Sequence, residues 1–564
     1  MSEVRALATL PLLAVNLALF LLPGVAAALL AGARRSLSPA RAVMLAVSVS
    51  AALGYGAFWA YFESRWLGRM FSFAILAAAL AFAAPALKRN RQLRALALEM
   101  ARPFACVVVV SLCWACFLFL FSNPFATGAE VANVRFFHDV QPGDNQIPLI
   151  FAERIYSQRP VEPFCCGDWL SSDRPPLQAG IFLLQRPLKL FGNVRLNYEL
   201  LGIGLQCLWI CGAWSLLKTL GAPVGRIEQV LGFLVFSGFL FYNSVFAWPK
   251  LLAATFILFV ASILLELLFA RRPLTWFDAG LAALAFALAL LAHPGSAFSA
   301  PALMLLAIRG RRFIGGTKLL AALALVFVLI APWIAYQKFY DPPGNRLLKM
   351  HLAGVGPIDS RSVPQAIRDT YSVLGPRTAA AYKWANVRTL LGPHPLLAGR
   401  SEQSRIAQRD YLWNALGILN TGWIALGVLV LRKRPPALRC SGLLIGITFL
   451  NLAALCIVLI GPGYTITACC SYADILLLSV GLLGFLLRLP RAALLVLFTL
   501  QALNLFLVWI FVKPAQMNGG QLQIGLLAAG IVCSAGLLWR FGLSIWRTPP
   551  PASLDASPEC PLPD

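Results

Sequence analysis

The residues best suited to chemistry lie in a polar segment between long apolar runs. It contains Asp139 and Asp144, and a helix-compatible stretch begins near Leu149. Asp is a preferred cap at the start of a helix, so one interpretation makes Asp144 an N-cap. A carboxylate can also take a proton from an attacking hydroxyl, and one oxygen can cap while the other faces a cavity. The sequence therefore offers Asp144 as a general base, with Asp139 as its partner or its alternative.

A cationic motif follows in the same segment, Arg174-Pro175-Pro176-Leu177. Two prolines fix the backbone and favour the start of a helix, which would hold Arg174 at the entrance. A guanidinium beside a helix N-terminus suits phosphate, because backbone N–H groups and the helix dipole add to its charge. The competing interpretation is an arginine that reaches from an apolar surface to the membrane interface.

Further candidates lie on other polar links. Lys250 follows Trp248-Pro249 and could contact phosphate, although Trp and Lys on such a turn favour a membrane-interface anchor. Arg346, Lys349 and His351 follow an Asp-Pro-Pro-Gly turn and could line a phosphorylated headgroup. Tyr464 could border the same cavity, although a loop tyrosine at the interface is favoured.

The elements that must position these residues are membrane-spanning helices. The chain has 564 residues, of which 59% are hydrophobic and 12% charged. Soluble proteins carry about 25% charged residues, so lipid must be the solvent for much of the surface. Apolar runs near the roughly 20 residues that cross a bilayer recur throughout. We expect spans at 8–32, 42–62, 70–87, 102–122, 197–217, 228–246, 250–270, 275–292, 295–308, 318–337, 411–431, 441–460, 472–487, 491–512 and 521–538.

The net charge of +24 reflects topology rather than nucleic-acid binding. Lys and Arg gather in every second link, as the positive-inside rule requires: near 34–41, 88–94, 218–226, 271–272, 309–318, 432–439, 488–491 and 540–547. With these links in the cytoplasm and against anionic lipid headgroups, the N-terminus lies outside an inner (plasma) membrane and the C-terminal tail inside. Nucleic acid is excluded as the main partner.

Two outer links are much longer than the others, at 123–196 and 338–410. Long ordered links are usually functional, and 147–156 and 177–190 are candidate helices in the headgroup plane. The expected organisation is 1–101 (N-terminal spans), 102–337 (core with the first link), 338–410 (second link), 411–548 (C-terminal spans) and 549–564 (disordered tail).

Thirteen cysteines lie mostly in the spans, where a free Cys is a small hydrophobe. The exceptions are two vicinal pairs on outer links, Cys165–Cys166 and Cys469–Cys470. An oxidising compartment would permit a bridge between the links, and the sequence leaves its existence and its pairing open.

These motifs together resemble a known family. Asp144 followed by Ala152-Glu153-Arg154 is similar to a D-E-A-R-Y-A-E-I-A-R-E segment, and Arg174-Pro175-Pro176-Leu177 is similar to (Lys/His)-Pro-Pro-Leu. His293-Pro294-Gly295 is similar to a His-Pro-Gly turn. Over about 137–310 the chain thus resembles the GT-C glycosyltransferases, most closely the protein O-mannosyltransferases and the lipid A aminoarabinose transferase. Asn145 stands where the family often has a second acid.

The resemblance implies an all-α GT-C-like bundle of about 13–15 membrane helices, with interfacial helices in two large outer loops. It implies an inverting transfer of a sugar from a polyprenyl-phosphate donor to a glycan, lipid or protein acceptor on the outer face. Asp144 would be the base, or Asp139, and Arg174 and His293 would bind substrate. The cofactor is unknown; a divalent metal held by Asp144 and Asp139 is left open.

Three other functions compete with the enzyme. A transporter or flippase for a lipid-linked sugar would place ionisable groups in mid-membrane, where the sequence has few. An O-antigen-ligase-type enzyme also uses outer-loop arginines, but the order Asp, helix, Arg-Pro-Pro favours the GT-C type. A structural scaffold would not explain two long polar links on one side.

Overall fold

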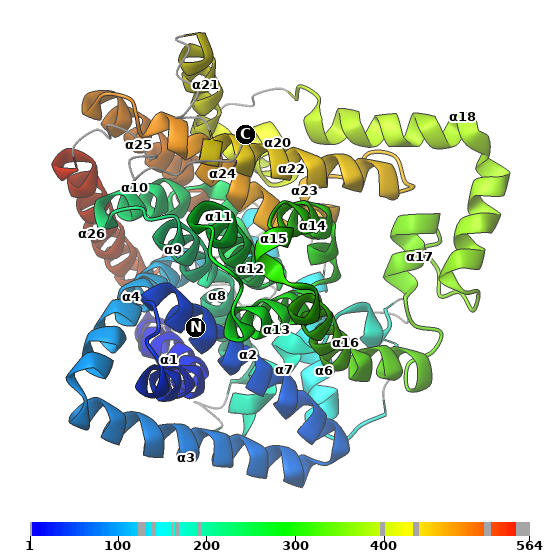
Figure 1. Ribbon diagram of the computed structural model, residues 1–564, viewed down its shortest axis with the longest axis horizontal. Coiled ribbons are helices and arrows are strands. Elements are labelled where there is room, and N and C mark those ends of the chain that lie inside the picture. The colour runs from blue at the N-terminus through cyan, green and yellow to red at the C-terminus, as the bar shows by residue number, and fades with distance from the viewer. Residues whose placement is uncertain are drawn as a thin grey trace.

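The computed structural model describes residues 3–121, 131–137, 143–160, 162–163, 169–188, 193–394, 401–431, 439–512 and 521–548. These residues are almost entirely helical (Figure 1). Within the described ranges no strand is present, and Phe121 and Leu522 form an isolated antiparallel bridge. Asp139, Cys165, Cys166 and the tail from 549 onward lie outside the described residues.

The described residues contain eleven helices that are long and apolar enough to cross a membrane. The chain is therefore an all-α polytopic membrane protein. These spans are Leu10–Arg34, Pro39–Glu63, Arg65–Ala83, Arg91–Leu118, Val194–Thr219, Lys250–Ala270, Gly316–Phe339, Leu412–Leu431, Cys440–Val458, Arg491–Ile510 and Ile524–Arg547. They correspond to α1 (Glu3–Arg34), α2 (Pro39–Glu63), α3 (Arg65–Arg89), α4 (Arg91–Leu118), α8 with α9 (Val194–Cys207 and Trp209–Thr219), α12 (Lys250–Ala270), α16 (Gly316–Phe339), α20 with α21 (Leu412–Leu416 and Thr421–Leu431), α22 (Arg439–Val458), α25 (Arg491–Leu505, continued by a π-helical turn at Phe506–Ile510) and α26 (Ile524–Arg547).

The expected total of 13–15 spans exceeds what the structure supports. All fifteen predicted segments are helical, but α10 (Val224–Val235) and α11 (Gly238–Val245) form a pair bent by 72°, which makes at most a twelfth span. Two more helices, α13 (Trp276–Ala292) and α24 (Tyr472–Leu486), are apolar but short. The segment 295–308 is a 3₁₀ turn followed by the ten-residue α14 (Ala300–Arg309), too short to span a bilayer.

The links that alternation assigns to one side contact one another. Gln158 of the first long link donates to the carbonyl of Tyr61 at the end of α2. Asp341 at the start of the second long link accepts from Ser171 and Ser172 of the first. The same group includes the links near 246–250, 293–295, 459–471 and 511–523; for example, Lys250 reaches Ala468. We call this end of the bundle the site face.

The remaining links contact one another at the other end, which we call the opposite face. Arg41 binds Glu266 and Asp278, which joins the links before α2 and before α13. Leu274 donates to the carbonyl of Phe313, and Arg226 donates to the carbonyl of Leu487. The two faces therefore separate as charge alternation along the sequence predicts.

The first long link is packed inside the bundle rather than laid on the membrane surface. Its helix α7 (Leu177–Gln185) is buried at every residue, and α6 (Ile147–Tyr156) is buried on most of its surface. Gly180 of α7 meets Gly54 of α2 so closely that a Cβ on Gly180 would lie 2.3 Å from the Gly54 carbonyl oxygen. Small residues permit this backbone approach. We expected helices in the headgroup plane at 147–156 and 177–190; this is wrong for 177–185, because α7 has no exposed face.

The second long link forms α17 (Arg346–Ala353), α18 (Val363–Leu391) and α19 (Glu402–Asp410). The α18 helix is kinked at Gly375, whose φ of 69° lies in the left-handed region. In Figure 1, α18 runs along the right margin, while α17 lies nearer the bundle. The link therefore sends α17 toward the site face and carries α18 to the periphery.

Candidate active site

Asp144 and Arg174 form a buried ion pair. Asp144 Oδ1 lies 2.8 Å from Arg174 Nη2, and the side chains are 13% and 5% exposed, respectively. The two atoms meet without the alignment of a hydrogen bond. The two motifs of the first long link, thirty positions apart in the sequence, thus converge as expected. Their chemical roles remain predictions.

Asp144 does not cap the helix that follows it. It lies in a 3₁₀ turn, Gly143–Asn145, and the N-cap of α6 is Gln146, which makes no side-chain cap hydrogen bond. The cap interpretation is wrong because this turn inserts a residue between Asp144 and the cap. The carboxylate is consequently not used by the helix end and faces Arg174.

Arg174 lies at the entrance of α7, as the Pro-Pro pair predicts. Its guanidinium lies over the rings of Trp169 and Trp248, 5.0 and 5.6 Å from their centroids, and Nη1 donates to the Asp173 carbonyl. Among the described residues Nε has no hydrogen-bond partner. A buried arginine between two indole rings contradicts the interpretation as an interfacial arginine and leaves an N–H for an anion.

A chain of amide and hydroxyl groups fixes the pair in place. Tyr198 of α8 donates to the carbonyl of Asn145, next to Asp144, at 2.8 Å. Gln178 of α7 donates to Tyr198 Oη at 2.7 Å and to the carbonyl of Ala247 at 2.8 Å. Gln178 also accepts from Gln206, 3.2 Å away. The network therefore ties the Asp144 turn, the helix behind Arg174 and the turn before Lys250 into one rigid unit.

Lys250 and Trp248 are part of the site rather than an interface anchor. The anchor interpretation is wrong because both are buried, with Lys250 2% exposed. Lys250 Nζ donates to the carbonyls of Thr467 and Ala468 and lies 4.3 Å from the Trp248 ring centroid. The turn is held by Ala247, which adopts φ 53°, a left-handed conformation unusual for a residue with a Cβ.

His293 joins the same cluster from the turn after α13. Its ring lies 5.3 Å from the Trp248 ring in an edge-on arrangement, and Nδ1 accepts from the Gly295 N–H at 3.0 Å. Burial, then nearby Lys250 and Arg174, holds the pKa of His293 well below its usual value. The neutral ring with an accepting Nδ1 carries its proton on Nε2, which has no partner in the described part of the chain.

His351 and Tyr464 close the cluster from the second long link and the link after α22. Their rings lie 5.5 Å apart, and His351 Nδ1 lies 3.7 Å from Cys469 Sγ. Burial, together with the charges of Lys250 and Arg174, lowers the pKa of His351 to about 4. Burial also raises the pKa of Tyr464 to about 12. Both groups are therefore neutral near pH 7.

The three basic residues of α17 do not act together as expected. Arg346 packs on Trp169, 4.9 Å from its centroid, and lies 3.3 Å from Asp173. Trp169 is thus contacted by the guanidinium groups of both Arg174 and Arg346. Lys349 instead donates to the carbonyl of Asp359 within its own link. Lys349 and His351 are two residues apart, roughly 200° around the helix axis, so the helix directs the two side chains to different sides.

The described residues near Asp144 do not fit a metal site. Among them, no three His, Cys, Asp or Glu side chains are grouped as metal ligands. The partner of Asp144 is a cation, and Lys250 lies close enough for its charge to act on the same histidine as that of Asp144. Asp139, the other carboxylate considered as a base and as a metal ligand, lies outside the described residues.

Sequence reasoning missed several groups at this face. Trp169 and Gln178 contact or position the ion pair, yet each looks like an ordinary loop or helix residue. Arg409 forms a two-point pair with Asp410, both contacts 2.9 Å, and lies 4.5 Å from the Phe137 centroid. The signal available for Arg409 was its place at the end of the second long link, next to Asp410.

Two buried carboxyl groups inside helices were also missed. Glu199 of α8 is fully buried, and within the described residues neither of its oxygens has a hydrogen-bond partner. Asp474 of α24 accepts from Asn451 at 2.6 Å and lies beside Ser299. Glu199 is the sixth residue of its helix and Asp474 the third, so both lie near the site face rather than in mid-membrane.

Cys469 and Cys470 carry free thiols. Burial raises the pKa of Cys469 to about 12, so the thiol beside His351 is protonated. The other vicinal pair, Cys165–Cys166, lies outside the described residues. Within the described residues these two thiols form no disulfide, and Cys469 lies beside His351.

No protein-family model matches the chain, and neither a curated protein nor a solved structure matches it.

Proposed function

We propose that this protein is a membrane glycosyltransferase of the GT-C type. It transfers a sugar from a polyprenyl-phosphate-linked donor to an acceptor at the site face, with inversion at the anomeric carbon. The observation that carries the proposal is the buried Asp144–Arg174 ion pair, which lies among cations and neutral donors from separate segments. In this proposal the site face is the outer face of a bacterial-type inner membrane, with the N-terminus outside and the C-terminus in the cytoplasm.

The arrangement supports a division of labour between a base and an anion site. Asp144 accepts the proton of the acceptor hydroxyl as that oxygen bonds to the anomeric carbon. The bond between the anomeric carbon and the phosphate oxygen breaks, and both electrons leave with the phosphate. Arg174 and the Nε2–H of His293 then stabilise the departing anion.

The ion pair also suggests how donor binding prepares the base. Arg174 holds the Asp144 carboxylate at 2.8 Å without hydrogen-bond alignment. A phosphate competes for the same guanidinium, because Arg recognises phosphate through several N–H donors at once. Binding of the donor thereby releases a carboxylate oxygen toward the acceptor hydroxyl.

Transport of a lipid-linked sugar is the second candidate. The buried carboxyl groups Glu199 and Asp474 favour it, because ionisable groups within membrane helices often serve ion-coupled transport. Their positions near the helix ends at the site face suit transport less well than mid-membrane positions would.

A proteoliposome assay separates the two candidates. Purified protein is reconstituted with a polyprenyl-phosphate sugar, and an envelope membrane extract supplies acceptors. A transferase releases polyprenyl phosphate and consumes the donor in the presence of the extract. Translocation of an intact, labelled donor across the bilayer without consumption would establish transport and overturn the proposal.

A matched pair of variants ties the activity to the site. Asp144→Asn removes the proposed base, whereas Asp359→Asn removes a carboxylate of the second long link that pairs locally with Arg361. We expect donor consumption to fall only in the first variant. An Asp139→Asn variant tests the alternative base, and near-wild-type turnover in the Asp139→Asn, Asp144→Asn double variant would end the assignment of both carboxylates.

A further inference from the structure

A separate cavity lies on the opposite face, away from the candidate active site. It has a volume of about 250 Å³ and lies between α4, α9, α10 and α26. Its wall is mainly apolar and includes Val109, Trp214, Leu231, Val532 and Phe541. A water molecule occupies about 30 Å³ and needs polar partners, so water is a poor occupant of this space.

Two arginines line the same cavity. Arg102 pairs with Glu99 at 3.0 Å and Arg540 pairs with Glu228 at 2.7 Å, and their side chains are 51% and 56% exposed. Lys218 shares Glu99 at 3.8 Å. Three cations and two carboxylates leave this rim one positive charge in excess. A guanidinium has five N–H donors, so each arginine retains donors for a further anion.

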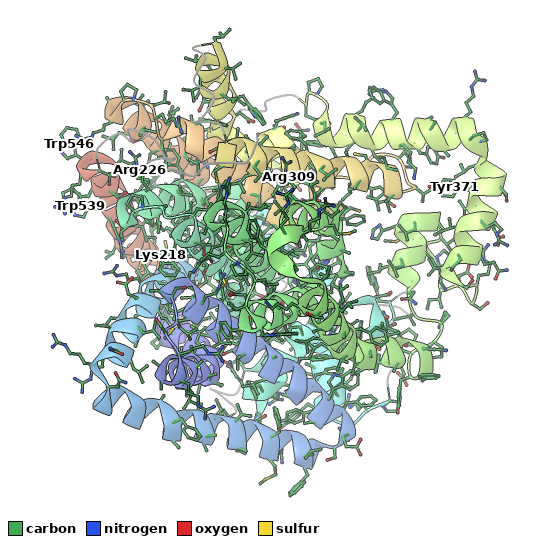
Figure 2. The ribbon with its side chains drawn as sticks, in the orientation of Figure 1. Lys218, Arg226, Arg309, Tyr371, Trp539 and Trp546 are labelled. Carbon is green, nitrogen blue, oxygen red and sulfur yellow. The ribbon has the colours of Figure 1, made fainter. Side chains whose placement is uncertain are left out.

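The cavity is placed at the depth of lipid headgroups on that face. Trp539 and Trp546 of α26 are 71% and 63% exposed, and Figure 2 shows both at the left margin, at the edge of the bundle. Exposed tryptophans favour the boundary between headgroups and acyl chains. Val532, deeper along the same helix, is 70% exposed and also lines the cavity. The opening therefore faces lipid, with its arginines at the boundary.

We propose that this cavity binds one anionic phospholipid from the leaflet at the opposite face. One acyl chain fills the apolar cavity, and the phosphate lies between Arg102 and Arg540. Basic pockets between membrane helices recognise anionic headgroups in this way. Free phosphate would leave the apolar wall uncovered, and a zwitterionic lipid would leave the excess positive charge without a counter-ion.

The chain offers a matched pair of variants for the cavity. A Cβ added at Gly536, which lines the cavity, or at Gly542, which lies further along α26, meets no atom within 4 Å. Gly536→Leu therefore fills the cavity without a backbone clash, and Gly542→Leu adds the same side chain outside it. Both variants are purified as full-length protein in detergent, and the retained phospholipid is identified and counted by native mass spectrometry.

We expect wild type and Gly542→Leu to retain about one anionic phospholipid per chain, and Gly536→Leu to lose most of it. Equal retention in all three proteins would overturn the cavity as the binding site. Retained lipid with the composition of the bulk membrane would overturn the preference for an anionic headgroup.

The Arg102→Gln, Arg540→Gln double variant tests the headgroup independently of the cavity. Titration with phosphatidylglycerol should show binding weakened by roughly tenfold or more, with phosphatidylethanolamine binding little changed. Glycerol phosphate serves as the soluble headgroup probe. Binding of glycerol phosphate as tight as that of phosphatidylglycerol, or an unchanged lipid preference in the double variant, would contradict the proposal.

Discussion

The two ends of the bundle each bury an ionic cluster, and the clusters are built differently. At the opposite face one arginine, Arg41, is held by two carboxylates, Glu266 at 2.7 Å and Asp278 at 2.6 Å. At the site face one carboxylate, Asp144, is held by Arg174, with Lys250 close by. In the first cluster Arg272 also pairs with Glu266, so two arginines face two carboxylates, whereas the second cluster has more cations than carboxylates.

The balance of cations and carboxylates indicates the role of each cluster. Arg41 joins α2 to α12 and α13, and every charge in that cluster has a counter-charge within the protein, which is typical of a structural joint. The site-face cluster keeps an unpartnered Arg174 Nε and His293 Nε2 among the described residues. Unpartnered donors in a buried site favour an anionic ligand.

Among the variants, Asp144→Asn is expected to have the largest effect on turnover. The amide keeps the shape of the side chain but cannot take the hydroxyl proton, so kcat should fall by about 10²–10⁴-fold. Donor consumption in proteoliposomes measures it, and the rate is expressed per folded molecule because Arg174 loses its counter-ion in this variant. A variant with more than half of the wild-type rate would remove Asp144 from the chemistry.

Arg174→Gln should have the next largest effect. Loss of the guanidinium removes charge stabilisation of the leaving phosphate, and kcat/KM should fall by roughly 10²–10³-fold. Arg174→Lys should recover only part of it, because an ammonium group is a point charge without the planar fork. Full recovery by lysine would show that charge alone matters and that the indole-stacked geometry does not.

Arg41→Gln should lower stability and leave turnover unchanged. It leaves Asp278 without its cation and Glu266 with Arg272 alone, so stability should fall, by about 3 kcal/mol at most. Activity per folded molecule should remain close to wild type. Denaturant-induced unfolding in detergent measures the first quantity, and the rate per folded protein measures the second. A selective loss of turnover would show that Arg41 has a functional role and would contradict its assignment as a structural joint.

Gln178→Leu should have a moderate effect on turnover. It removes the hydrogen bonds to Tyr198 and to the Ala247 carbonyl, which hold the Asp144 turn and the Lys250 turn in register. We expect kcat to fall roughly tenfold with KM little changed, because small displacements of reacting groups are costly. Gln178→Glu, which keeps the size and the acceptor but loses both donors, should be no more active than Gln178→Leu. An unchanged kcat in Gln178→Leu would show that the network is only structural.

The smallest effect concerns pH. Burial lowers the pKa of His351 to about 4, whereas the unfolded imidazole titrates near its ordinary value of 6.5. Above about pH 6.5 the imidazole is neutral in both the folded and the unfolded chain, so stability does not depend on its protonation. Between about pH 6.5 and 4 the unfolded chain binds a proton that the folded chain excludes. Stability should therefore fall as pH is lowered through this window. Melting temperatures should fall less in His351→Gln, and equal losses in both proteins would refute the assignment.

Much of the fold follows from local sequence. Apolar length and alternating charge predicted the eleven spans that the structure contains and the separation of the two faces, because each depends on the nearby sequence. The predicted span at 295–308 is wrong because Pro294 and Gly295 begin a 3₁₀ turn, which leaves too few residues for a helix that crosses the bilayer. The burial of α7 could not be predicted, since it depends on Gly54 and Gly180 meeting from distant parts of the chain.

The site was predictable where a residue's neighbours in sequence decide its position. Pro175 and Pro176 place Arg174 at the start of α7. Trp248 and Lys250 were misread as an interface anchor, because their burial depends on the Thr467–Ala468 segment more than 200 positions away. Gln178 carries no local signal, because its partners come from α8 and from the turn before α12.

The most direct test of the central claim is the binding of a polyprenyl monophosphate to wild type, Asp144→Asn and Arg174→Gln. If donor phosphate displaces Asp144 from Arg174, Asp144→Asn binds the probe at least as tightly as wild type while it loses transfer. Arg174→Gln then binds it at least tenfold more weakly. Equal affinities in all three proteins, or weaker binding in Asp144→Asn than in Arg174→Gln, would contradict the account.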